Sequence, residues 1–355
     1  PDDYPEANQK RRSTVLYEMY DQGYITKEEY EKAKAEEVKI VASKDALKET
    51  DNNSYFVDAL IDQVVKALMD KFGYEKTHAN KIFYSSGYKI YATVDANIQK
   101  TMESVFSDQK TYGLKGKNGA TLQGSMTVID YNGHVKGLVG GIGEKIGQRG
   151  FNRATSAVRQ PGSTMKPIAA YAPAIEKDII NYSSIVNDTK TNYNGWTPVN
   201  WYSSYWGNIT VQYALERSVN TIPVYLVNKL GTQVSFDFLT KTLGITTLTN
   251  EDVNLAPLGM GGNLGQYHAP TLFTKVTDQH DEIVFEYDSS PTMAISEDTA
   301  TVMNKLLQTV VYGSRGTGAA ARNTVKDMKI FAKTGTSNNS NDLWFVGGTP
   351  YYVGS

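Results

Sequence analysis

Gln160-Pro161-Gly162-Ser163-Thr164-Met165-Lys166-Pro167 leads into an apolar, alanine-rich run at residues 168–172. Gly162 predicts a turn and the apolar run predicts a helix, so Ser163 is expected at a helix start. Pro167 then falls in the first turn, where a missing N–H is tolerated. Lys166 follows Ser163 by three residues, so both side chains are expected on one helix face, with the amine close enough to take the hydroxyl proton.

A lysine acts as a base only when it is neutral. Burial and the positive end of a helix dipole both lower the pKa of a lysine, and this position offers both. A simpler interpretation is that Ser163 only caps the helix, because Ser-x-x-Lys is a common pattern. The motif therefore needs support from the rest of the chain.

A second candidate lies 55 positions after Ser163, at Ser218-Val219-Asn220. It follows the helical run at residues 211–217 and precedes Pro223, which predicts a tight turn between two helices that carries a hydroxyl and an amide. Ordinary helix capping by Ser218 or Asn220 is the alternative.

A third candidate is Lys333-Thr334-Gly335-Thr336, at the end of an alternating run that predicts a strand. Gly335 would let a peptide lie close to the strand, Thr334 and Thr336 could donate to a substrate carboxylate, and Lys333 adds positive charge. An exposed strand end with a glycine bulge is the alternative.

The three motifs occur in the order typical of penicillin-binding proteins and class A β-lactamases. From about residue 122 to 355 the chain resembles the transpeptidase domain of a bifunctional class A penicillin-binding protein. Flanking stretches extend the resemblance: Arg159 before the first motif, residues 205–220 before the second, Gly316-Thr317-Gly318 before the third and residues 342–347 after it. The resemblance implies a peptidoglycan D,D-transpeptidase that β-lactams acylate.

The resemblance also implies a role for each residue. Ser163 would attack the carbonyl between two terminal D-alanines of a stem peptide, with Lys166 as the base. Ser218 and Lys333 would relay a proton to the departing D-alanine, and Asn220 would hold the peptide amide and position Lys166. The backbone N–H groups of Ser163 and Thr336 would form the oxyanion hole. Thr334, Gly335 and Thr336 are the expected substrate-binding residues.

The order of elements predicts an α+β fold, an antiparallel sheet flanked by helices, with a small N-terminal linker region. Strands are expected at residues 88–94, 126–130 and 135–139, at 329–337 and 343–347, and from Tyr351 onward, with helices dominating from Gly162 to Lys329. Residues 1–50 resemble the tail of a peptidoglycan glycosyltransferase domain with linker helices, 51–121 are expected to form an interdomain linker region, and 122–355 an incomplete transpeptidase domain.

Composition limits the possible partners and cofactors. The 355 residues include 36 basic and 38 acidic side chains and no cysteine, which gives no case for nucleic acid and removes thiol chemistry. The four histidines show no ligand spacing, so we expect neither metal nor cofactor. No run of apolar residues predicts a membrane span. The resemblance implies an anchor in a missing N-terminal segment, a place on the extracytoplasmic face of the bacterial membrane, and cell-wall synthesis proteins as further partners.

Two questions stay open at this level. A D,D-carboxypeptidase or β-lactamase would use the same serine but pass the acyl group to water, and neither Glu176 nor Glu216 sits in a recognisable motif for a deacylating base. A non-catalytic scaffold or a β-lactam sensor could also retain the fold.

The chain further departs from the family after Gly262, where only Asn263 and Leu264 stand in place of a helix, so we expect residues to be missing there and beyond Ser355.

Overall fold

The structure is a computed structural model that describes residues 5–36, 52–108, 115–116, 119, 121–145, 147–248, 266–288, 290–322, 328–337 and 340–349. Within these ranges it combines helices with small antiparallel sheets, which confirms the expected α+β class. The single sheet that the sequence suggested is divided into five small sheets in the described part. The strand expected from Tyr351 onward and the short passage after Gly262 lie outside the described residues.

The N-terminal helices α1 (Pro5–Asp21) and α2 (Lys27–Ala35) form a hairpin. Thr26 caps α2: its hydroxyl accepts from the N–H of Glu29, whose carboxylate accepts from the N–H of Thr26. This reciprocal arrangement is a capping box, and it satisfies two N–H groups that the helix leaves unpaired.

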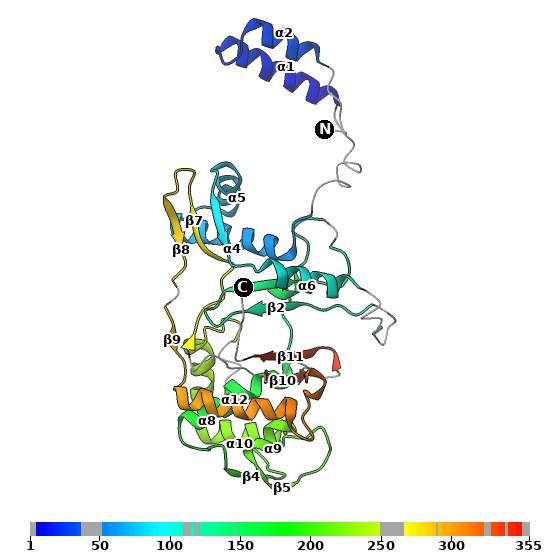
Figure 1. Ribbon diagram of the computed structural model, residues 1–355, viewed down its shortest axis with the longest axis vertical. Helices are drawn as coiled ribbons and strands as arrows, with labels where there is room; N and C mark the ends of the chain where they lie inside the picture. Colours follow the sequence, from blue (N-terminus) through cyan, green and yellow to red (C-terminus); the bar gives the residue numbers. More distant parts are fainter. Residues whose placement is uncertain are drawn as a thin grey trace.

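One hydrophobic core lies in the upper part of Figure 1, around α4 (Tyr55–Phe72). Ser54 caps the start of α4, and Gly73, with a φ of 69°, ends it in the left-handed conformation that glycine adopts without strain. The elements that pack with α4 are α5 (Lys76–Ser85), β1 (Lys89–Ala92), β3 (Val135–Val139), β7 (Phe273–Thr277) and β8 (Ile283–Glu286). In one sheet β7 pairs antiparallel with both β1 and β8, so segments far apart in sequence share this core.

A smaller cluster lies beside this core. Helix α6 (Ala96–Ser107), capped by Asp95, packs on the hairpin of β2 (Met126–Ile129) and β3 through Met102, Phe106 and Val139. Gly133 turns that hairpin with a φ of 81°, which glycine adopts without strain.

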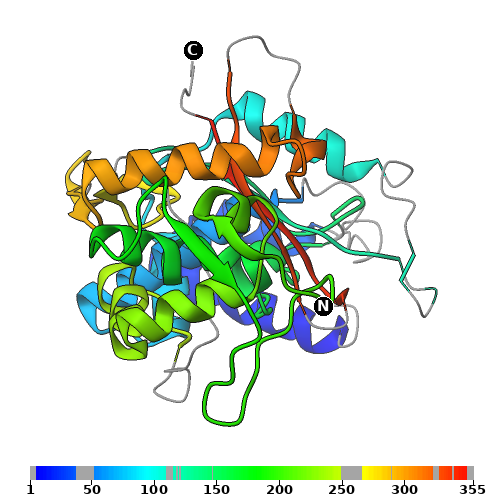
Figure 2. The same ribbon diagram turned by 90° about the horizontal axis from the view of Figure 1, so that it is seen from below.

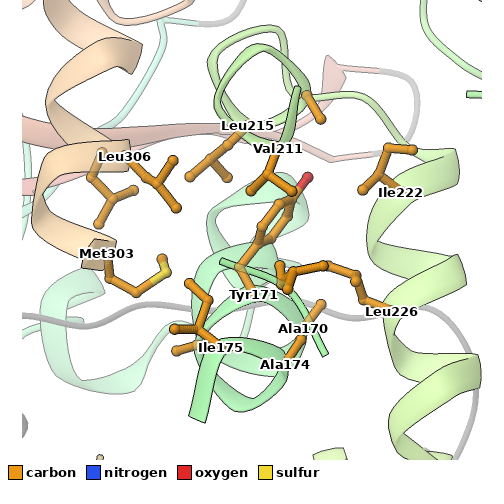
Figure 3. Packing of buried hydrophobic residues seen from close by; sticks show 14 of the residues in the cluster. Ala170, Tyr171, Ala174, Ile175, Val211, Leu215, Ile222, Leu226, Met303 and Leu306 are labelled. Atoms are coloured by element: carbon orange, nitrogen blue, oxygen red, sulfur yellow. The ribbon is translucent and has the colours of Figure 1, made fainter. Parts of the chain in front are cut away.

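The second large core surrounds the residues that follow the Ser-x-x-Lys motif. Tyr171 is fully buried among apolar side chains from the surrounding helices (Figure 3). The surrounding elements are α8 (Ala172–Glu176), α9 (Val211–Glu216), α10 (Thr221–Leu230) and α12 (Glu297–Tyr312), with the hairpin of β4 (Ile185–Asp188) and β5 (Gly207–Thr210). Each large apolar side chain buried here stabilises the fold by about 1.5–3 kcal/mol relative to exposure.

The hairpin of β10 (Phe331–Thr336) and β11 (Leu343–Gly348) lies beside this core, and α12 packs against β10 (Figure 2). Lys333 pairs with Val346 and Gly335 with Trp344. The remaining described elements are α7 (Arg153–Ser156), η1 (Gly162–Met165), η2 (Pro167–Tyr171), α11 (Thr232–Asp237), η3 (Phe238–Thr242), β6 (Gln266–Tyr267), β9 (Thr292–Met293) and η5 (Ala319–Ala321).

Helices dominate the described residues from Gly162 to Lys329, as expected, but the sequence did not predict the short strands among them. Strands β4 to β9 fall in this range, and β7 and β8 complete the sheet of β1. Both carry β-branched and aromatic residues around a polar turn at residues 278–281, which is a hairpin signal that could have been used. No helix within the described ranges is long and apolar enough to cross a membrane.

Candidate active site

Ser163 lies in η1, a short 3₁₀ turn, rather than in the regular α-helix that the sequence predicted. Pro167 has no N–H, so it cannot donate to the Ser163 carbonyl as an α-helix requires. The N–H of Lys166 donates to that carbonyl instead, and the chain continues through the π-helical turn η2 before α8 begins. Such irregular turns are frequent at functional sites.

The backbones of η1 and β10 approach each other closely at two glycines. A Cβ on Gly162, whose φ is 58°, would lie 2.5 Å from the Thr336 carbonyl oxygen, and one on Gly335 would lie 2.4 Å from that of Pro161. The sequence suggested that Gly335 leaves room for a peptide. In the structure that space is occupied by the segment that carries Ser163, and this close approach puts the Ser163 and Thr336 backbones beside one another.

Lys166 is buried and reaches the Ser218-Val219-Asn220 turn. Its Nζ lies within hydrogen-bond distance of the Ser218 carbonyl (2.8 Å), the Val219 carbonyl (3.2 Å), Asn220 Oδ1 (2.5 Å) and Ser218 Oγ (3.3 Å). Burial, followed by repulsion from the Lys333 ammonium, holds the pKa of Lys166 well below its ordinary value. The neutral amine that the sequence argument required is therefore favoured here.

Lys333 approaches the same hydroxyl from β10. Its Nζ donates to Ser218 Oγ (2.9 Å) and to the Thr334 carbonyl (2.8 Å), and none of the Lys333 surface is exposed. Burial lowers the pKa of Lys333 to about 7. The two lysines and Ser218 thus form a chain of groups that can hold and pass a proton, because a hydroxyl both donates and accepts.

Ser218 occupies the tight interhelical turn that the sequence predicted. It lies between α9 and α10 with a φ of 54°, in the left-handed region that non-glycine residues rarely adopt. Backbone strain of this kind persists only where the surroundings impose it, and it is concentrated at functional sites.

Ser163 Oγ makes no hydrogen bond within the described part of the chain, so the expected Ser163–Lys166 contact is not present. Lys166 instead uses its donors on the Ser218 turn. In unliganded enzymes such catalytic hydrogen bonds often form only when substrate is bound.

The expected substrate-binding residues sit on the last part of β10. Thr336 is exposed, Gly335 is buried against η1, and Thr334 is half-buried with its hydroxyl donating to Thr317 (2.8 Å). Trp344 on β11 donates from Nε1 to the Gln160 carbonyl (3.0 Å) and so ties this hairpin to the nucleophile segment.

Sequence reasoning missed two residues behind the site, Asp188 and Asn200. Asp188 is fully buried on β4, and Asn200 is 4% exposed in the loop at residues 189–206 between β4 and β5, called here the aromatic loop. No motif or periodicity marks either one. The loop itself is held by aromatic packing, with the Tyr202 and Trp206 rings stacked 3.7 Å apart.

Neither glutamate considered as a deacylating base is free for that role. Glu176 accepts from the N–H and hydroxyl of Ser296, and the buried Glu216 accepts from the N–H of Arg315. Among the described residues, no group of three or more histidine, aspartate or glutamate side chains could hold a metal ion.

The fold and this arrangement of two serines and two lysines define a site of the serine acyltransferase type. Residues 124–254 and 260–352 match the model of the penicillin binding protein transpeptidase domain, and the chain belongs to this family.

Known proteins are similar over nearly the whole chain. Penicillin-binding protein 1A of Clostridium botulinum (strain Langeland) is 32% identical over 382 residues, which cover 98% of this chain and 46% of that protein. Penicillin-binding protein 1F of Bacillus subtilis is 29% identical over 99% of this chain and 49% of that protein. The chain therefore spans about half the length of these relatives.

Solved structures show the same fold. PonA1 of Mycobacterium tuberculosis superposes with a TM-score of 0.64 at 21% identity, over 83% of this chain and 80% of that one. Penicillin-binding protein 1A of Haemophilus influenzae superposes with a TM-score of 0.63 at 20% identity, over 96% of this chain and 70% of that one. A further PonA1 structure contains penicillin V.

Proposed function

We propose that the chain is a peptidoglycan D,D-transpeptidase that works through an acyl-enzyme on Ser163 and is acylated by β-lactams at the same atom. The observation that carries this proposal is the buried Ser218 hydroxyl, which lies within 3.3 Å of the Lys166 amine and 2.9 Å of the Lys333 amine. Membership of the family and the penicillin V bound to PonA1 support it.

In the first half-reaction Ser163 Oγ attacks the carbonyl between two terminal D-alanines, and its proton passes to neutral Lys166. The C–N bond then breaks, and the departing D-alanine takes a proton through Ser218 and Lys333. N–H groups of Ser163 and Thr336 stabilise the oxyanion, a contribution of about 3–4 kcal/mol per donor in related chemistry. Thr334 and Thr336 line the place where the peptide lies, and Gly335 lets the segment that carries Ser163 lie close beside them.

In the second half-reaction an amine of a neighbouring stem peptide attacks the Ser163 ester. Its proton returns through Lys166 to Ser163 Oγ, the ester bond breaks, and the new amide bond is the cross-link. Asn220 holds the peptide amide and Lys166 throughout. Water as the acceptor would instead give the D,D-carboxypeptidase reaction, but Glu176 and Glu216 are both engaged elsewhere.

The proposed setting follows from the relatives. Residues 1–50 are assigned to the tail of a glycosyltransferase domain with its linker, 51–121 to an interdomain region and 122–355 to the transpeptidase domain. We place the whole protein on the extracytoplasmic face of the bacterial membrane, anchored by a segment outside this chain, where other cell-wall synthesis proteins are candidate partners.

Product analysis with a stem-peptide thioester and a D-amino acid acceptor tests the reaction. We expect the amide between the stem peptide and the acceptor to be the main product, and Ser163→Ala to abolish it. Free acid as the main product at saturating acceptor would contradict transfer and favour the carboxypeptidase reaction.

A further inference from the structure

Helix α10 begins in an unusual way. Asn220 occupies its N-cap position, where an asparagine side chain normally accepts from a backbone N–H of the first turn. Asn220 makes no such bond, because its Oδ1 accepts from Lys166 Nζ (2.5 Å) and its Nδ2 donates to the Val199 carbonyl (2.8 Å). The N–H groups at the start of α10 therefore need another acceptor.

Asn200 supplies that acceptor from the aromatic loop. Its Oδ1 accepts from the N–H of Asn220 (2.9 Å) and lies 3.4 Å from the N–H of Thr221. Pro223, at the third helical position, has no N–H to satisfy. A residue 20 positions earlier thus caps α10 in place of the N-cap residue itself.

Asp188 fixes the orientation of the Asn200 amide. Asn200 Nδ2 donates to Asp188 Oδ1 (2.8 Å) and to the Ser204 carbonyl (3.1 Å), and both of these atoms only accept. The amide therefore cannot turn its oxygen toward Asp188, and the oxygen faces α10.

The Asp188 carboxylate itself is fully satisfied. Besides Asn200 it accepts from Thr221 Oγ1 (2.6 Å), from the Tyr202 hydroxyl (2.6 Å) and from the N–H of Trp206 (2.9 Å). Burial alone raises the pKa of Asp188, but the donors from Thr221, Tyr202, Trp206 and Asn200 together lower it below the ordinary value. Asp188 is thus held ionised inside the protein, as a fixed acceptor.

We propose that Asn200, held in one orientation by Asp188, is a positioning residue that caps α10 in place of Asn220 and so leaves the Asn220 side chain to hold Lys166. Asn200 itself touches neither Lys166 nor Ser163. It acts only through Asn220, and that restriction distinguishes it from a residue that merely stabilises the fold. The inference rests on the proposed acylation of Ser163.

A double-mutant cycle on the full chain tests this coupling. The first-order acylation rate (k2) and the binding constant for a fluorescent penicillin are measured by stopped flow, per titrated active site, in Asn200→Ala, Asn220→Ala and the double variant. We expect Asn200→Ala to lower k2 about 10- to 100-fold with little change in binding, the range typical of a displaced catalytic group. In the Asn220→Ala background the same substitution should change k2 little, whereas the melting temperature should fall in both backgrounds.

Two further variants sharpen the test. Asp188→Asn keeps the side-chain shape but lets the Asn200 amide turn, so it should lower k2 as Asn200→Ala does. Asp188→Asn replaces Asn200→Ala in the test if the Asn200→Ala protein does not fold. Tyr202→Phe removes another donor from Asp188 without touching Asn200, and its k2 should match the wild type.

An equal drop in k2 in both backgrounds, or no drop in either, would overturn the inference. Wild-type protein that is not acylated at all would contradict the proposed function, whereas acylated wild type with additive effects would contradict only the role of Asn200.

Discussion

Burial of two lysines beside one hydroxyl group disfavours the charged form of both. Lys166 and Lys333 share Ser218 Oγ, and burial lowers both pKa values. For Lys166 this is the condition for accepting the proton of Ser163, because only a neutral amine has a free lone pair. The same burial makes the stability of the protein depend on pH.

Lys166→Arg tests the base directly. A guanidinium stays protonated at any working pH, so the variant keeps the charge but cannot accept the Ser163 proton. We expect the rate of penicillin acylation to fall about 10²- to 10⁴-fold, the usual contribution of a general base. Lys241→Arg, an exposed lysine paired with Asp237, is the matched control and should acylate at the wild-type rate. A Lys166→Arg rate close to wild type would contradict the assignment.

Lys333 should make the folded state more stable as pH rises. Its pKa is about 7 in the folded protein and near 10.5 when unfolded, so between these values the unfolded chain binds more protons. The free energy of unfolding then rises with pH across this window, by about 1.4 kcal/mol per pH unit for one proton. This gain in the free energy of unfolding is lost again as the pH falls toward 7, where Lys333 becomes protonated in the folded protein too.

Urea unfolding between about pH 7.5 and 9.5 measures this slope. Lys333→Met, which cannot titrate, should show a flatter dependence than the wild type, while Lys66→Met at an exposed position should not. Parallel curves for wild type and Lys333→Met would show that Lys333 is charged in the folded protein.

The residues that we propose bear the chemistry lie in motifs that the sequence reveals, whereas Asp188 and Asn200 do not. Ser163, Lys166, Ser218, Asn220 and Lys333 belong to short motifs whose order is informative. Asp188 and Asn200 act through contacts between separate loops and carry no pattern of their own. The assignment of roles to all these residues stays a prediction until variants are measured.

At the scale of elements, the approach of η1 to β10 positions Ser163. This contact depends on the absence of side chains at Gly162 and Gly335. Gly335→Ala should push the nucleophile segment away from β10, lower the free energy of unfolding by about 1–3 kcal/mol, the typical cost of overpacking, and slow acylation.

Gly150→Ala is the control for this change, because a Cβ at Gly150 would meet nothing within 4 Å. Thermal unfolding and the penicillin acylation rate report the two effects. A Gly335→Ala protein that matches Gly150→Ala in both measurements would show that the close approach is not needed.

Elements were predicted well where local signals were strong. The strands expected at residues 126–130, 135–139, 329–337 and 343–347 appear as β2, β3, β10 and β11. The prediction of a regular α-helix from Ser163 was wrong because Pro167, its fifth residue, cannot supply the N–H that an α-helix needs there. The hairpin of β7 and β8 was missed although it carries a local signal, whereas the pairing of β7 with β1, some 180 residues earlier, lies beyond the reach of local patterns.

At the scale of the molecule, the two large hydrophobic cores are separate. Leu68 on α4 belongs to the core shared with β7, and Leu226 on α10 to the core behind the active site (Figure 3). Both side chains are fully buried on helices, so they form a matched pair. We expect the core around α4 to support the fold without shaping the site.

Leu68→Ala and Leu226→Ala should each lower the free energy of unfolding by about 2–5 kcal/mol, the usual cost of a buried leucine. Only Leu226→Ala should slow acylation, because α10 carries Asn220 at its start. Denaturant unfolding and stopped-flow acylation at 25 °C provide the comparison. If Leu68→Ala slows acylation as much as Leu226→Ala, the two cores do not act independently.

The central claim is that penicillin forms a covalent bond with Ser163. Mass spectrometry of the intact protein after incubation with penicillin, followed by peptide mapping, tests it most directly, with Ser163→Ala and the control Ser156→Ala treated alike. We predict an increase of one penicillin mass on the peptide that carries Ser163, present in Ser156→Ala and absent in Ser163→Ala. An adduct that survives in Ser163→Ala, or that maps to Ser218, would contradict the account.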